Sequence, residues 1–152
     1  MSDKGCLIDR EDIAHIGIVV NNIEESKNYV TSLFGVDHWT VFDYEATADT
    51  MIVGDPFKLK IAGTMLGPVG IELIQPIESP HSVWGQFIKD HGEGIHHIAY
   101  KVRNFQDAVF KLEEDGAKVL VSVVPGAGTY WAYIATEPAG IIMELMNFDL
   151  KF

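Results

Sequence analysis

The sequence has a single cysteine, Cys6, in a polar N-terminal stretch. One cysteine cannot form an internal disulfide, so we expect a surface thiol and a cytoplasmic protein. Residues 1–12 also lack the apolar core that a secretory signal needs. No window reaches the roughly 18 consecutive apolar residues of a membrane span. These absences predict a soluble protein without a membrane partner.

Positive charge is scarce as well. The chain of 152 residues has 11 Lys and Arg against 22 Asp and Glu, which gives a formal net charge of −11. Such a chain repels phosphate backbones, so we expect no nucleic-acid partner. No Pro- or Ser-rich linker divides the sequence, and its length suits one domain, expected over residues 1–152.

What the chain does contain is an internal repeat. The segment HIGIVVNNIEES, which begins at His15, recurs as HIAYKVRNFQDA at His97. In both copies an apolar run of strand length leads to an asparagine and then to a helical pattern. Three strand-like stretches follow each helical pattern, at residues 38–44, 57–64 and 70–75 and again at residues 117–124, 129–136 and 141–147.

The repeat predicts an α+β fold made of two βαβββ modules, whose curved mixed sheets enclose a cleft. Module 1 is expected at about residues 12–76 and module 2 at about residues 94–148. Within residues 77–91, apolar side chains at helical spacing predict a helix that connects the modules. Asn22 and Asn104 are the predicted N-caps of the two repeated helices.

Two glutamates occupy positions that do not suit solvated side chains. Glu72 and Glu144 each lie in the middle of an apolar strand, the last strand of its module. A buried carboxylate without a partner costs several kcal/mol or more, so each needs one. His15 and His97 open the first strands of the same modules. If the modules are related by a pseudo-twofold axis, two His and two Glu converge on the cleft, a set that suits a divalent metal ion.

The remaining histidines are expected to lie elsewhere. His96 precedes His97, and adjacent strand residues point to opposite faces, so only one of them enters the cleft. The register of the repeat selects His97. Three histidines have no repeat partner and are expected at the surface: His38, His81 and His91. The first module is ten residues longer between its His and its Glu, and this excess falls in a predicted loop at residues 45–56.

These features resemble the vicinal oxygen chelate superfamily, which includes glyoxalase I, methylmalonyl-CoA epimerase, extradiol dioxygenases and bleomycin-resistance proteins. The resemblance extends over about residues 13–147. The metal positions of the family fall on four residues here: His15, Glu72, His97 and Glu144. This His/Glu/His/Glu set looks like bacterial glyoxalase I. The segments IELIQP, GEGIHHIAY and GIIMEL look more like the epimerases.

The resemblance implies a divalent metal cofactor (Co, Ni, Mn or Zn), and as substrate an acyl-CoA or another thioester or carbonyl compound. The metal polarises the substrate oxygen while a carboxylate removes the neighbouring proton. Two residues are candidates for this base: Glu45, which lies near the position of an epimerase base but outside the usual sequence context, and Glu144, displaced from the metal. Family members commonly form homodimers, so we expect one here.

Four functions stay open. A methylmalonyl-CoA epimerase-like enzyme would invert the carbon next to the thioester, and an enzyme like lactoylglutathione lyase (glyoxalase I) would isomerise a hemithioacetal through the same enolate step. An Fe(II) oxygenase would use two His and one carboxylate, and the fourth ligand argues against it. A non-catalytic protein that binds a small molecule, with Trp131 and Tyr133 in its cleft, would need no metal set.

Overall fold

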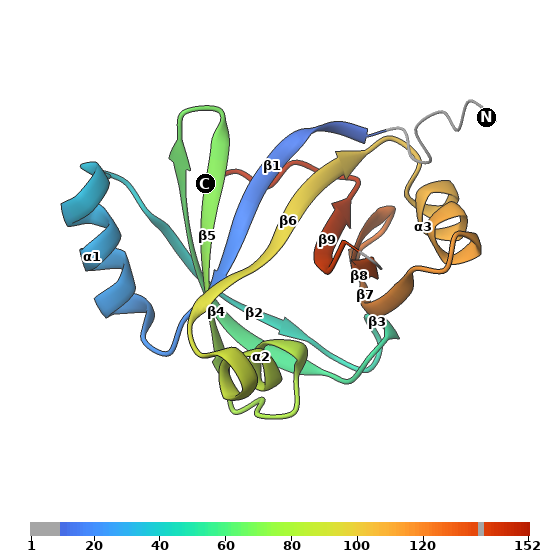
Figure 1. The fold of residues 1–152 in the computed structure, drawn as a ribbon, viewed down its shortest axis with the longest axis horizontal. Helices are drawn as coiled ribbons and strands as arrows, with labels where there is room; N and C mark the ends of the chain where they lie inside the picture. The colour runs from blue at the N-terminus through green and yellow to red at the C-terminus, as the bar shows by residue number, and fades with distance from the viewer. Residues whose placement is uncertain (1–9, 137–138) are drawn as a thin grey trace.

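The computed structural model describes residues 10–136 and 139–152, so Cys6 lies outside the described residues. The described strands form one mixed sheet in the order β2-β4-β5-β1-β6-β9-β8-β7-β3, and helices lie at its periphery (Figure 1). The helices are α1 Ile23–Phe34, α2 Val83–His91 and α3 Phe105–Glu114. The strands are β1 Arg10–Val19, β2 Thr40–Ala46, β3 Met51–Val53, β4 Phe57–Leu66, β5 Val69–Ile77, β6 Gly94–Val102, β7 Lys118–Gly126, β8 Thr129–Thr136 and β9 Ile141–Met146.

Two βαβββ units make up this sheet, which confirms the predicted α+β fold. In the first unit β1 pairs in parallel with β5, and in the second β6 pairs in parallel with β9. Antiparallel neighbours extend the two units outward, through β4 to β2 and through β8 to β7. Strands β1 and β6 run antiparallel at the centre, with Ile16 opposite Ile98, and join the units into one sheet.

Local signals explain where the repeated helices begin. The Asn22 side chain accepts hydrogen bonds from the backbone N–H groups of Glu24 and Glu25, and the Asn104 side chain accepts one from Asp107. Both asparagines therefore act as the predicted N-caps, because they satisfy donors that have no partner within the helix. Helix α1 ends at Gly35, whose left-handed φ of 66° suits glycine.

One strand lies where a loop was predicted. Within residues 45–56, β3 leaves the first module and pairs antiparallel with β7 of the second, with Met51 opposite Val123. Three residues are too few to show a periodic pattern, so the sequence gives no signal for this strand. Strand β2 also begins two residues later than predicted and runs to Ala46, so Glu45 belongs to a strand.

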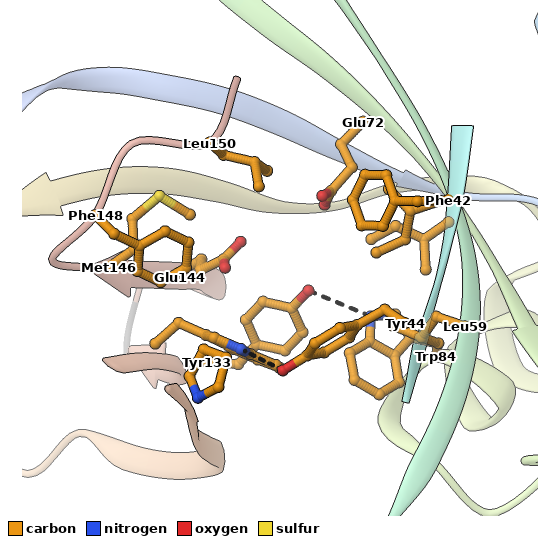
Figure 2. A pocket seen from close by; sticks show the side chains of 14 residues that line it. Phe42, Tyr44, Leu59, Glu72, Trp84, Tyr133, Glu144, Met146, Phe148 and Leu150 are labelled. Atoms are coloured by element: carbon orange, nitrogen blue, oxygen red, sulfur yellow. Dashed lines mark hydrogen bonds between the residues drawn. The ribbon is translucent and has the colours of Figure 1, made fainter. Parts of the chain in front are cut away.

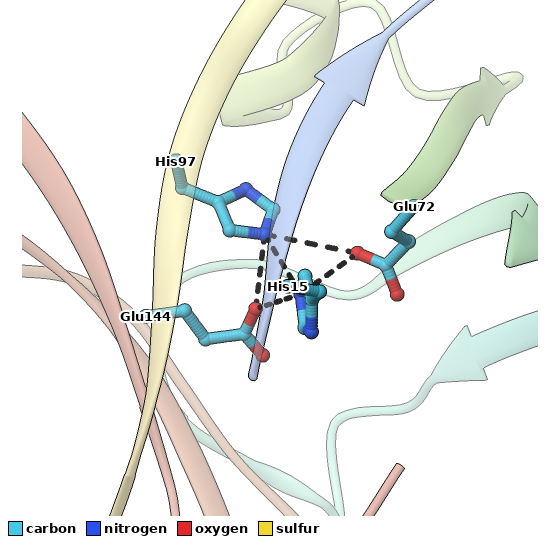
Figure 3. Close-up of side chains that lie close together, drawn as sticks. All are labelled: His15, Glu72, His97 and Glu144. Atoms are coloured by element: carbon cyan, nitrogen blue, oxygen red, sulfur yellow. Dashed lines mark hydrogen bonds and ion pairs between the residues drawn. The ribbon is translucent and has the colours of Figure 1, made fainter. Parts of the chain in front are cut away.

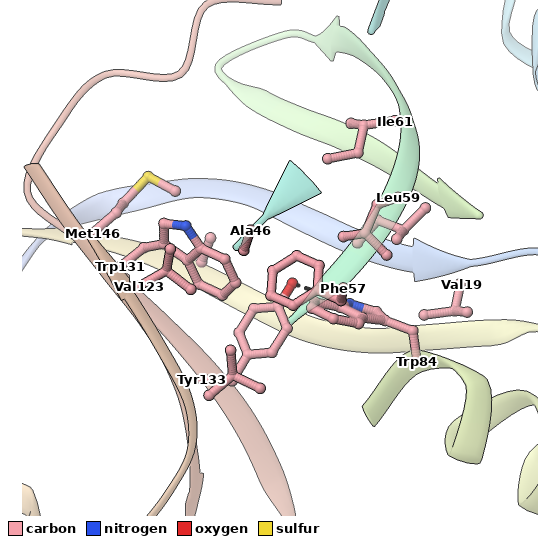
Figure 4. Packing of buried hydrophobic residues seen from close by; sticks show 13 residues of the cluster. Val19, Ala46, Phe57, Leu59, Ile61, Trp84, Val123, Trp131, Tyr133 and Met146 are labelled. Carbon is pink, nitrogen blue, oxygen red and sulfur yellow. Dashed lines mark hydrogen bonds between the residues drawn. The ribbon is translucent and has the colours of Figure 1, made fainter. Parts of the chain in front are cut away.

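The main core cluster fills the space between the two halves of the sheet (Figure 4). Helix α2 contributes Trp84, which is 1% exposed and whose ring centroid lies 4.6 Å from that of Phe57. Trp131 and Tyr133 of β8 pack on the same cluster. The connecting helix therefore fixes the aromatic side of the cleft. No helix in the described part of the chain has the length and apolarity of a membrane span.

Candidate metal centre

Four side chains from the four central strands meet in the cleft (Figure 3). His15 lies on β1 beside Glu72 on β5, and His97 lies on β6 beside Glu144 on β9. All four are buried, with exposed fractions of 1–6%. Each offers one ligand atom, and these atoms lie within 4.8 Å of one another. The structure thus brings together the four residues that the repeat singles out.

The distances fit ligands that surround a single ion. The Nε2 atoms of His15 and His97 are 3.2 Å apart, and each lies 3.0 Å from Oε2 of Glu144. The Oε2 atom of Glu72 is 3.4 Å from His15 Nε2 and 3.7 Å from His97 Nε2. Ligand atoms bound at about 2.1 Å in tetrahedral or octahedral geometry are separated by roughly 3.0–3.4 Å. These residues could therefore hold a divalent cation.

The electrostatics of the cluster also call for a cation. Burial lowers the pKa of His15, but the charges and hydrogen bonds of Glu72 and Glu144 outweigh this and raise it to about 10. Burial raises the pKa of Glu144, and its contacts with His15 and His97 reverse the shift and lower it. A proton on His15 and a divalent ion compensate the same two carboxylates. A divalent ion held by these residues would take the place of that proton.

His96 contacts the candidate ligand His97 and supports its orientation. Its Nδ1 lies 3.1 Å from Nδ1 of His97, and its ring contacts the rings of Trp84 and Phe87. Burial, followed by the charge of His97, lowers the pKa of His96 to about 3, so this imidazole is neutral at physiological pH. A neutral His96 can accept the Nδ1–H of His97, which leaves the Nε2 lone pair of His97 directed at the site.

A cavity of about 120 Å³ adjoins the ligands (Figure 2). Glu72 and Glu144 belong to its lining, and most of the remaining wall is aliphatic or aromatic. The aromatic lining comes from both modules and from α2, and consists of Phe42, Tyr44, Trp84, Trp131, Tyr133 and Phe148. Trp131 and Tyr133 thus line the cavity as the sequence led us to expect. The site combines a charged ligand cluster with an apolar chamber.

Two tyrosine hydroxyls in this wall are paired with the indole N–H groups of two tryptophans that also line it. The Tyr44 hydroxyl accepts a hydrogen bond from Trp131 Nε1 at 3.1 Å, and the Tyr133 hydroxyl accepts one from Trp84 Nε1 at 3.3 Å. Because the indoles act only as donors, each hydroxyl keeps its own hydrogen for another partner. Burial, followed by the charges of Glu144 and Glu72, raises the pKa of Tyr133, so this hydroxyl stays protonated.

Residues 147–152 cross from the second module to the first and complete the cavity. Phe148 and Leu150 line it, and the Phe152 ring lies over Gly63 and Gly70, 5.8 Å from the His15 ring. A Cβ atom at Gly63 would overlap the Phe152 ring. Sequence reasoning missed this segment, although its apolar residues alternate with polar ones.

Glu45 is not brought to this site. Its side chain lies on the exposed face of β2, 3.5 Å from Lys58 Nζ, and the cavity-facing position beside it belongs to Tyr44. Alternation along the strand puts neighbouring side chains on opposite faces. Glu45 was a candidate base because it lies near the position of an epimerase base in the family resemblance, and that position does not fix which face of the strand its side chain occupies. The three histidines expected at the surface are exposed: His38, His81 and His91.

The sequence is similar to proteins of known and unknown activity. It is 26% identical over 135 residues to an uncharacterized protein of Bacillus subtilis, a match that spans 86% of this chain and 88% of the relative. It is 24% identical over 111 residues to the mitochondrial methylmalonyl-CoA epimerase of Bos taurus, covering 70% of this chain and 55% of that protein. A shorter match of 60 residues, at 38% identity, joins 40% of this chain to 45% of an ethylmalonyl-CoA/methylmalonyl-CoA epimerase of Cereibacter sphaeroides.

Solved structures share the fold. A hypothetical protein of Bacillus halodurans superposes with a TM-score of 0.64 at 28% identity and covers 93% of this chain and 96% of its own. The methylmalonyl-CoA epimerase of Mycobacterium tuberculosis gives a TM-score of 0.65 at 17% identity, over 98% and 95% of the two chains. The model of the glyoxalase/bleomycin resistance protein/dioxygenase superfamily matches residues 14–133. The chain belongs to this superfamily.

Proposed function

We propose that this chain is a metal-dependent isomerase that removes the proton next to a carbonyl or thioester group. One observation carries the proposal: a buried set of two histidines and two glutamates faces an apolar cavity. A bound divalent ion, with Co, Ni, Mn and Zn as candidates, supplies Lewis acidity toward the substrate oxygen. The relatives named as epimerases support an acyl thioester as the first substrate class to test.

Glu144 is the base in this proposal. Burial alone raises the pKa of Glu144, and only its contacts with His15 and His97 lower it. A rotation of the carboxylate away from the two histidines therefore increases its affinity for a proton. Glu45 has no part in the step because its carboxylate lies on the exposed face of β2.

Other side chains of the cavity orient the substrate. The free hydroxyl hydrogens of Tyr44 and Tyr133 are donors for an oxygen that becomes negative during proton removal. The aromatic wall and residues 147–152 keep water from the reacting carbon. An activity like that of lactoylglutathione lyase is the second candidate, because the ligand set holds two glutamates and a hemithioacetal reacts through the same proton removal.

Deuterium incorporation tests the proposal. Full-length protein loaded with a divalent metal is incubated in D₂O with a series of acyl-CoA thioesters that includes methylmalonyl-CoA and propionyl-CoA, or with the hemithioacetal of methylglyoxal and glutathione, and the α-carbon is followed by NMR. We expect one metal ion per chain and exchange that requires the metal. A protein that purifies without chelator and holds no divalent metal would contradict the proposal, and would favour the non-catalytic binding protein. The homodimer stays a prediction that sedimentation tests.

A further inference from the structure

The net charge of the metal-loaded ligand set affects which charge a substrate can carry when it binds beside the metal. Glu72 and Glu144 bind a metal as carboxylates, and His15 and His97 bind it as neutral imidazoles. A divalent ion therefore balances its own ligands, and the loaded set carries no net charge. A ligand set with one carboxylate would instead keep one positive charge.

The cavity wall offers no charge to compensate an anion. No Lys or Arg occurs among the described residues that line the cavity. Among the described lining residues, the polar side-chain groups other than the carboxylates are the hydroxyls of Tyr44 and Tyr133 and the two indole N–H groups that donate to them. Each hydroxyl already accepts an indole N–H and has one hydrogen to donate, which suits a carbonyl oxygen.

A free carboxylate in this chamber is costly. In the metal-loaded site it would lie beside a ligand set without net positive charge and against apolar walls, and burial of an ion without a compensating charge costs several kcal/mol. The chain as a whole, at a net charge of −11, gives no long-range attraction for an anion.

We propose that the part of the substrate that enters this cavity is a neutral carbonyl compound or thioester with an apolar group beside the reacting carbon, and not a malonate-type acid with a free carboxylate there. This rests on the proposed function and narrows its substrate class. It separates this site from an enzyme whose substrate holds a second acid group next to the metal.

We call this preference for a neutral group beside the metal the charge rule. A matched pair of metal-binding probes tests it without turnover. 3-Methylbutanohydroxamate and malonate monohydroxamate have the same chelating group and differ in an isopropyl group against a carboxylate of similar size. Calorimetric titration of the zinc-loaded full-length chain measures both dissociation constants. We expect the neutral probe to bind on the order of 10-fold more tightly or better, which corresponds to about 1.4 kcal/mol.

Two variants that each remove one carboxylate charge sharpen the test. In Glu72→Gln the ligand set gains a net positive charge while the side chain keeps its shape and an oxygen. The preference for the neutral probe is expected to fall by about 10-fold or to reverse. Glu45→Gln removes the same charge at the exposed face of β2, and its preference should equal that of the unaltered protein.

The outcomes separate the two proposals. If the unaltered zinc-loaded protein binds the malonate probe as tightly as the neutral one, the charge rule is overturned and the proposed function stands. If the protein takes up no zinc, or binds neither probe, the proposed function fails and the charge rule fails with it. If Glu72→Gln retains no zinc, the ratio measured for the unaltered protein decides alone.

Discussion

The two modules contribute the same ligands but surround them differently. Each supplies one His from its first strand and one Glu from its last. In the second module the far nitrogen of His97 contacts His96. In the first, Nδ1 of His15 has no hydrogen-bond partner among the described residues, and its ring contacts Phe152. The repeat therefore sets the positions of the four candidate ligands, while departures from the repeat set the contacts around them.

The largest expected effect is a loss of zinc affinity when one of the four ligands shared by the two modules is removed. His15→Ala and Glu144→Ala each take one ligand from a buried cluster, so we expect the affinity for zinc to fall by at least about 100-fold. Zinc content after gel filtration and competition with a chromophoric chelator measure this loss. Glu45→Gln is the control and should bind zinc like the unaltered protein. Full zinc occupancy in either alanine variant would show that the site lies elsewhere.

The next largest effect is expected at the small residues that face the histidines. Gly17 lies opposite His97 in the ladder between β1 and β6, and Ala99 lies opposite His15. A Cβ atom at Gly17 would overlap the His97 ring. Gly17→Ala should therefore displace this ligand and weaken zinc binding by about 10- to 100-fold. Ala99→Gly, the mirror change, should keep the affinity and cost about 0.5–1 kcal/mol of stability. Equal zinc affinities in both variants would contradict this asymmetry.

His96, which the first module lacks, should make stability depend on pH. Its folded pKa of about 3 lies below the ordinary 6.5, so below pH 6.5 the unfolded chain binds a proton that the folded chain does not. The stabilisation is complete above pH 6.5 and is lost as pH falls toward 3. Between about pH 7 and pH 5 the unaltered protein should lose about 2 kcal/mol relative to His96→Phe. Urea unfolding of the metal-free proteins measures this, and parallel pH profiles would refute it.

The smallest expected effect is on stability, at the contact between the Phe152 ring and the first module. Phe152→Ala and Gly63→Ala should each cost about 1 kcal/mol, because the first removes the ring and the second expels it from its place. The double variant should be no less stable than either single one, because both changes lose the same contact. Gly94→Ala, where a Cβ atom meets open space, is the control. Additive losses in thermal unfolding would argue against a shared contact.

The repeat made the ligand cluster predictable. A pattern that occurs twice indicates which residues lie in equivalent strands and which of them point to the same face. Features that occur only once in the sequence were harder to predict. Glu45 was chosen from its approximate position in the family resemblance, and a shift of one residue along a strand moves a side chain to the opposite face. Strand β3 is too short to show alternation. Trp84 was predicted on a helix, but its place in the cavity depends on how α2 packs against Phe57, which is tertiary information.

The pairing of β1 with β6 bears on the order in which the chain folds. Ile16 pairs with Ile98, so the central ladder cannot form until most of the chain has been synthesised. Contacts so distant in sequence slow folding, because chain entropy is lost before they form. The ligands are divided between the modules, and the last of them, Glu144, lies in β9. Metal capture should thus complete folding and not nucleate it, and zinc should slow unfolding more than it speeds refolding.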